Sequence, residues 1–105
     1  MITINIASEY TKTPGGRFIT EGKFSGEDFR KRLLKPKFLE AIANDEGLTV
    51  ILDGGYGYAT SFLEEAFGGL ARETKNEKVK EIIIISDEEP QLVRKIKEYI
   101  EDALV

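Results

Sequence analysis

Isoleucines occupy every second position from residue 2 to residue 6, with polar residues between them. This period of two predicts a half-buried strand over residues 2–7. A polar stretch follows and ends in the turn signal Pro14-Gly15-Gly16. We predict that residues 17–21 form a second strand, antiparallel to the first, so that the chain opens with a hairpin.

Two later runs are apolar at almost every position. They cover residues 48–53 and 82–85. A strand without polar alternation is typical of a sheet that is covered on both faces. We therefore predict two buried strands, the first of which ends in an acid, Asp53.

The apolar spacing between the two strand regions is that of a helix. Ser25 and the acid three residues later have the spacing of a capping box, and an apolar face follows them. Pro36 interrupts that face, and Lys35 before it is expected to leave the helical region. We predict two helical pieces, 26–34 and 36–44.

Two more helices follow the apolar runs. The first covers about residues 62–75, where Ser61 and Glu64 have a second capping-box spacing. The second begins after Asp87, an expected cap, and tolerates Pro90 in its first turn. Its apolar face continues to the end of the sequence.

The order of elements is therefore β-β-α-β-α-β-α. A hairpin followed by two right-handed crossovers predicts a small mixed four-stranded sheet with helices packed on it, an α/β fold. A chain of 105 residues is long enough for one core, so we expect a single domain over residues 1–105.

The residue types in the sequence limit the reactions and ligands that we expect of this chain. The chain has no cysteine and no histidine, which removes thiol chemistry, the usual base near neutral pH and the commonest zinc ligand. We expect neither an enzyme nor a cofactor. The net charge of −4 disfavours direct nucleic-acid binding. The longest apolar run, Ile82–Ile85, is too short to cross a membrane, and without a basic-then-apolar leader we expect a cytoplasmic protein.

Most of the polar chemistry lies at one junction between a strand and a helix. There the glycine-rich loop 54–58 leads to Thr60 and Ser61 at the expected start of the helix. Hydroxyl groups and free backbone N–H groups at such a point suit a phosphate that is bound or added. Ser61 has two explanations that do not exclude each other: it caps the helix, or it accepts a phosphoryl group.

The glycines of this loop match neither the Walker A nor the dinucleotide-binding spacing. Left-handed backbone is the simpler explanation for them. The alternative is a small-ligand or nucleotide sensor, because the loop lies between the end of a strand and the start of a helix. The residues of that alternative site are Asp53, Gly54, Gly55 and Gly57.

The tyrosines of the loop and the start of the helix suggest a protein-binding surface. Each tyrosine either folds back onto the domain or is exposed as a hot spot for a partner. The Gly68-Gly69 pair in the helix indicates close packing, a kink or a smooth patch for a partner backbone. The candidate partner-binding residues are Tyr56, Tyr58, Glu64, Glu65 and Gly68.

Two charged clusters also have alternative explanations. The basic residues between Arg30 and Lys37 form a solvated face or steer an acidic partner. The acids Asp53 and Asp87–Glu89 are expected near the carboxyl edge of the sheet. Helix capping explains the second group simply, whereas Mg²⁺ coordination is the alternative.

The segment Thr60–Leu70, with the strand that ends in Asp53 before it, resembles the bacterial STAS-like family of unknown function. The chain is also similar to the fold shared by sulfate transporters and anti-sigma-factor antagonists. In those antagonists a partner that is both kinase and anti-sigma factor phosphorylates a serine at the equivalent junction. Ser61 is the best match to that serine, with Thr60 one place before it, although Ala59 and Phe62 replace the acid and glycine that flank the antagonist motif.

This resemblance implies a non-catalytic protein-interaction module in a bacterial signalling or regulatory switch. Phosphorylation of Ser61 or Thr60 is its expected control. The implied partner is a histidine-kinase-like ATPase acting as a serine kinase.

Overall fold

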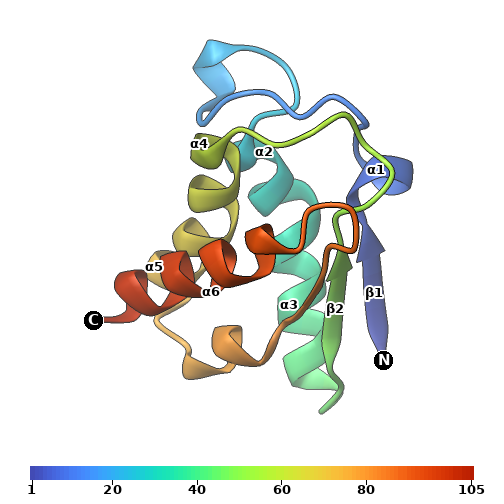
Figure 1. The fold of residues 1–105 in the computed structure, drawn as a ribbon. Helices are drawn as coiled ribbons and strands as arrows, with labels where there is room; N and C mark the ends of the chain where they lie inside the picture. The colour runs from blue at the N-terminus through green and yellow to red at the C-terminus, as the bar shows by residue number, and fades with distance from the viewer.

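The computed structural model describes residues 1–105, and its centre is a sheet of three parallel strands (Figure 1). These are β1 (Ile2–Asn5), β2 (Leu48–Ile51) and β3 (Ile83–Ile85), and they lie in the order β1-β2-β3. The structure confirms an α/β domain. The mixed four-stranded sheet was wrong, because only three strands form and all of them are parallel.

The missing strand is the one predicted over residues 17–21. Its backbone donors bond to carboxylates instead of a neighbouring strand. Glu21 accepts the N–H groups of Arg17 and Phe18 at 2.9 and 2.8 Å. Glu27 accepts the N–H of Ile19 at 2.9 Å, and residues Ile19–Glu21 form the 3₁₀ turn η1. These side-chain acceptors replace the ladder that a strand needs.

A short helix, α1 (Ile6–Glu9), follows β1 without a loop. The Asn5 side chain accepts the N–H of Ser8 at 3.1 Å, which is an N-cap. The predicted strand 2–7 therefore ends early, because its last residues enter this helix.

The two predicted helical pieces after Ser25 form one continuous helix. It consists of α2 (Gly26–Phe29), the π-helical segment η2 (Arg30–Leu34) and α3 (Lys35–Ala43). Ser25 caps it as predicted, since its Oγ accepts the N–H of Asp28 at 3.0 Å. The predicted break at Lys35 was wrong: the residue is helical, with φ −66° and ψ −47°. The widened π turn directly before Pro36 accommodates a residue that has no N–H.

The helix between β2 and β3 is also continuous. It consists of α4 (Thr60–Leu63), the π-helical segment η3 (Glu64–Gly68) and α5 (Gly69–Thr74). It begins two residues earlier than predicted, with Ala59 as its N-cap. The predicted cap at Ser61 was therefore wrong, because Ser61 lies within the first turn.

The chain closes with the 3₁₀ turn η4 (Glu77–Glu81), β3 and the long helix α6 (Gln91–Leu104). Pro90 is the N-cap of α6, so the predicted cap at Asp87 was also wrong.

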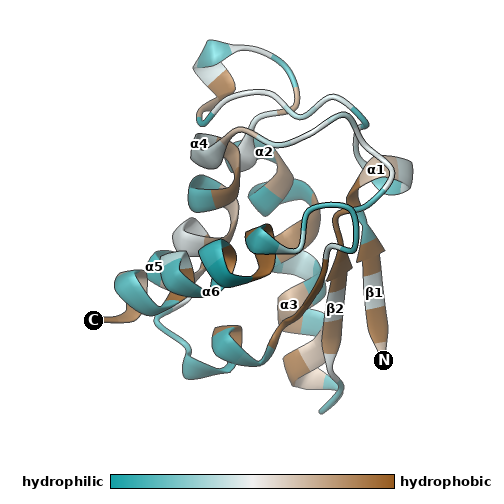
Figure 2. Cartoon of the chain, in the orientation of Figure 1, coloured by the Kyte–Doolittle hydropathy of each residue, from teal (hydrophilic) through white to brown (hydrophobic).

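One face of the sheet carries the core. Ile4, Val50 and Ile84 lie side by side in the register and are 0, 0 and 6% exposed. The helices gather on this side of the strands in Figure 1, and the brown strands and helix stripes of Figure 2 meet there. The phenylalanines Phe29, Phe62 and Phe67 fill the space between the helices and are fully buried.

A substitution at Gly26 allows this helix packing to be tested. A Cβ at Gly26 would lie 2.4 Å from the carbonyl oxygen of Phe62, so the two backbones touch. We expect Gly26→Ala to lower the free energy of unfolding by about 2 kcal/mol or more, because backbone has to move. Gly47→Ala is the control, since its Cβ would meet only the flexible end of Met1 at 3.2 Å. Urea unfolding of both variants measures the difference, and equal stabilities would contradict this contact.

Candidate switch surface at the strand–helix junction

Asp53 ties together the loops that follow β2 and β3. Its two carboxylate oxygens accept the N–H groups of Asp87 and Glu88 at 3.0 and 2.8 Å. In return, Glu88 Oε1 accepts the N–H of Gly54 at 2.9 Å. The acids at this edge therefore hold backbone, and the structure contains no group of three or more residues that could hold a metal ion.

The loop glycines have the left-handed backbone that the sequence indicated. Gly54 and Gly57 have φ values of +99° and +120°. Gly55 lies against Lys12, whose carbonyl oxygen accepts the N–H of Tyr56 at 2.9 Å. Two N–H groups of the loop are thus already engaged, and the Glu88 carboxylate lies beside one of them. These contacts do not favour a phosphate in the loop.

The two tyrosines have different environments. The Tyr58 hydroxyl donates to the Leu52 carbonyl at 2.8 Å, and the ring packs 5.8 Å from the centre of Phe62. Burial, and then the nearby charges of Asp53, Glu89 and Glu88, raise the pKa of Tyr58. Tyr56 is 83% exposed. Of the pair, only Tyr56 is available to a partner.

Thr60 and Ser61 lie at the surface end of α4. Thr60 is exposed and Ser61 is half-buried, while the next two residues, Phe62 and Leu63, are fully buried. Neither hydroxyl forms a hydrogen bond with another group of the chain. The two hydroxyl groups therefore have no structural task in the fold.

Glu64 begins an ion-pair network that the sequence did not predict. Its carboxylate pairs with Arg17 and with Arg72 of α5. Arg17 belongs to the segment of residues 10–25 between α1 and α2, here called the arm. Arg72 first, and then Arg17, hold the pKa of Glu64 below its usual value against the opposing effect of burial. The arm is thereby attached to the first turns of the helix.

Glu65 is the buried member of the network. Arg30 Nη1 donates to its carboxylate and to its backbone carbonyl, both at 2.7 Å. The Arg30 Nε lies 3.3 Å from Glu73 Oε1 without hydrogen-bond alignment. Arg30 is thus the buried member of the predicted basic cluster, and the remaining paired members are Lys31, Arg32, Lys35 and Lys37.

Close packing accounts for the Gly68-Gly69 pair. A Cβ at Gly69 would lie 2.3 Å from Arg30 Nη1, and one at Gly68 would lie 2.5 Å from Glu64 Oε2. Both glycines are buried. Of the predicted partner-binding residues, Glu65 and Gly68 are therefore interior, Glu64 is engaged in ion pairs, and Tyr56 is free.

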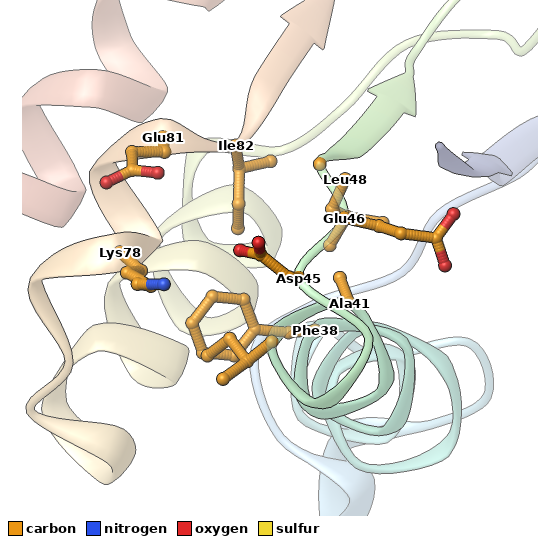
Figure 3. A pocket seen from close by; sticks show the side chains of 10 residues that line it. Phe38, Ala41, Asp45, Glu46, Leu48, Lys78, Glu81 and Ile82 are labelled. Carbon is orange, nitrogen blue, oxygen red and sulfur yellow. The ribbon is translucent and has the colours of Figure 1, made fainter.

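A separate hollow lies elsewhere in the domain. A pocket of about 240 Å³ opens at the amino ends of the strands, between the end of α3 and η4 (Figure 3). Phe38 and Ile82 form part of its apolar wall, and Lys78 and Asp45 lie at its mouth. Because Thr60 and Ser61 lie beyond the carboxyl ends, this pocket belongs to a different part of the domain.

A family model described as a STAS-like domain of unknown function matches residues 25–93. The chain belongs to this family. The matched part of the STAS-like domain begins at the Ser25 cap, contains both π-helical segments and the junction, and ends in α6. No curated protein and no solved structure matches the chain. None of the helices of the STAS-like domain is both long and apolar enough to cross a membrane.

The Arg30–Glu65 pair yields a stability prediction for the STAS-like domain. Glu65→Gln removes the buried carboxylate that Arg30 Nη1 contacts at 2.7 Å and leaves the guanidinium only the poorly aligned Glu73. We expect the free energy of unfolding to fall by about 3 kcal/mol. Glu77→Gln is the control, because Glu77 pairs with Lys80 on the surface and such pairs contribute about 1 kcal/mol at most. Denaturant unfolding compares the two, and a neutral Glu65→Gln variant would contradict the pair's role.

Glu64 yields a prediction on acid stability. Its pKa, like those of Glu27 and Glu73, lies below the ordinary value of 4.5 in the folded state. The folded state therefore holds fewer protons, and the stabilisation is present above pH 4.5 and lost as the pH falls through the lower folded pKa values. We expect thermal unfolding temperatures to drop below about pH 4.5. Arg72→Met should flatten this drop, and a rise in stability toward pH 3 would contradict it.

Proposed function

We propose that this STAS-like domain is a non-catalytic protein-interaction module of a bacterial regulatory switch. Phosphorylation of Ser61 or Thr60 is its control. The observation that carries the proposal is that the exposed Thr60 and the half-buried Ser61 lie at the start of a helix, and neither hydroxyl bonds to another group of the chain. Capping, the ordinary reason for a serine at this place, does not apply here.

The charges around the two hydroxyls favour a switch in binding over a change in fold. A phosphoryl group adds a charge of about −1.5 to −2. On Ser61 it would lie one helical turn before Glu64. Because Glu64 is already paired with Arg17 and Arg72, its repulsion of the phosphate is reduced and two guanidinium groups are close. The buried side of the helix, at Phe62 and Leu63, faces away from this charge.

The surroundings of Ser61 also support the proposal that the domain is not an enzyme. No base is hydrogen-bonded to Ser61, and both carboxylate oxygens of Asp53 accept hydrogen bonds from backbone N–H groups. A nucleophile needs a hydrogen-bonded base or a lowered pKa to react. The hydroxyls are therefore proposed as substrates of another protein's chemistry.

By resemblance, the proposed partner is a histidine-kinase-like ATPase that acts as a serine kinase. Its proposed contact surface consists of Tyr56 and the exposed residues Ala59 and Thr60 around Ser61. Tyr56 provides the large, exposed aromatic side chain that protein interfaces use as an anchor.

Phosphorylation can be tested directly. The protein is incubated with ATP and an ATPase of this class from the same organism, and the phosphate is mapped by mass spectrometry. We expect the label on Ser61 or Thr60, and its loss in the Thr60→Ala/Ser61→Ala double variant. Ser8→Ala, which removes an exposed helix hydroxyl elsewhere, is the matched control and should keep the label. A chain that stays unlabelled, together with unchanged binding by Ser61→Asp, would refute the switch.

The contact surface has its own test. Tyr56→Ala should weaken binding of the ATPase by about tenfold or more, as expected for an interface anchor. The variant should unfold like the parent protein, because Tyr56 does not contact the core. Leu39→Ala is the control, since Leu39 is an apolar residue on α3 that is 47% exposed. Equal effects of the two substitutions would argue against this surface.

A further inference from the structure

No long helix covers the face of the sheet opposite the core. The register places Thr3, Thr49 and Ile83 in one row across this face. The next row is Asn5, Ile51 and Ile85. Ile83 is 45% exposed and Thr3 is exposed. Thr49, between them, is only 6% exposed, and its hydroxyl donates to Met1 Sδ at 3.0 Å. Ile51 and Ile85 are half-buried. The long helices lie on the other side of the strands (Figure 1).

An open face is unusual for this kind of sheet. All-parallel sheets occur almost only with both faces covered, because their strands are apolar on both sides. Here the second row of β2 and β3 consists of isoleucines. A surface-exposed strand would normally carry polar residues at such positions. The apolar side chains indicate that another layer completes the sheet.

The charges around the face identify the chemistry of that layer. The two rows contain no charged residue. Asp53 and Asp87 follow the carboxyl ends of β2 and β3, and the Asp87 N–H donates to the Asp53 carboxylate at 3.0 Å. Glu88 lies beside them and is exposed. The face is thus apolar along the strands and acidic at one end.

A second copy of the chain fits this pattern poorly. The opposite end of the sheet carries Glu46, whose carboxylate is paired with the Met1 ammonium at 3.0 Å, so that end offers no free basic group. A face-to-face pair with strands in the same direction would bring Asp53 and Asp87 of the two copies together, and a pair with opposed strands would place them against this neutral pair. The net charge of −4 on each copy adds to that repulsion.

We propose that this face binds an amphipathic helix of a partner protein. The helix lays an apolar stripe along Ile51, Ile83 and Ile85, and basic residues at one of its ends meet Asp53 and Asp87. Helix on sheet is the layer arrangement that parallel sheets normally complete. The isoleucine stripe contains neither Tyr56 nor Ser61, so the proposal does not depend on the phosphorylation switch.

The test uses two synthetic helical peptides of about 18 residues, which share one leucine stripe. One has three lysines at one end, and the other has three glutamates there. Each is titrated into the ¹⁵N-labelled full chain and followed by NMR. We expect the lysine peptide to shift the amides of Thr3, Thr49, Ile51, Ile83 and Ile85. We expect the glutamate peptide to bind about tenfold more weakly or worse.

Variants give the test its matched control. Ile83→Glu should weaken binding of the lysine peptide by about tenfold, because a carboxylate would be buried under the bound helix. Leu39→Glu places the same charge at an apolar residue of similar exposure, 47% against 45%, on α3 and outside the two rows. It should leave binding unchanged, and Ser61→Asp should do so too, which separates this proposal from the switch.

Three results would overturn the proposal. The first is that neither peptide binds, or that shifts fall outside the face. The second is that both peptides bind equally, because the acidic end would then have no role. The third is a dimer in sedimentation velocity that Ile83→Glu dissociates, because a second copy would then cover the face.

Discussion

The buried pair of Arg30 and Glu65 is the interaction on which the arrangement of the helices depends. Arg30 reaches from one long helix to the other and bonds to both the carboxylate and the main-chain carbonyl of Glu65. Both residues lie in π-helical segments, where the ordinary ladder is widened and a side chain can bond to a backbone carbonyl. Gly69 leaves room for the guanidinium, so the backbone and the ion pair are matched.

This pair also orients the candidate switch surface. The helix that contains Glu65 begins at Thr60. Glu64, the residue before Glu65, forms an ion pair with Arg17 and so holds the arm. The start of the helix is therefore fixed from two directions, by the buried pair and by the arm. Rigid support of this kind leaves Thr60 and Ser61 at a constant position on the surface, which suits groups that another protein has to recognise.

The domain has two surfaces that the fold does not use, and they differ in chemistry. The junction has hydroxyls and one exposed tyrosine, beside ion pairs. The open sheet face has isoleucines and threonines, with carboxylates at its end. The junction lies at the carboxyl edge of the parallel sheet, which is where α/β proteins commonly place their binding sites. The open face runs along the strands, and only its acidic end reaches that edge. In the proposed function, two such surfaces give the domain two contacts for partner proteins.

The sequence by itself determined the apolar strands, the helix periods, the Ser25 cap, the left-handed loop glycines and membership of the STAS-like family. Each of these follows from residues within a few positions of one another, whose spacing decides backbone conformation directly. Tertiary structure alone decided the rest. The partners of Arg17, Arg30 and Glu65 are 35 to 48 residues apart in the chain, and no local pattern reports them. For the same reason the strand expected at residues 17–21 became an arm, Ser61 lost its capping role to a helix start at Ala59, and one sheet face stayed open.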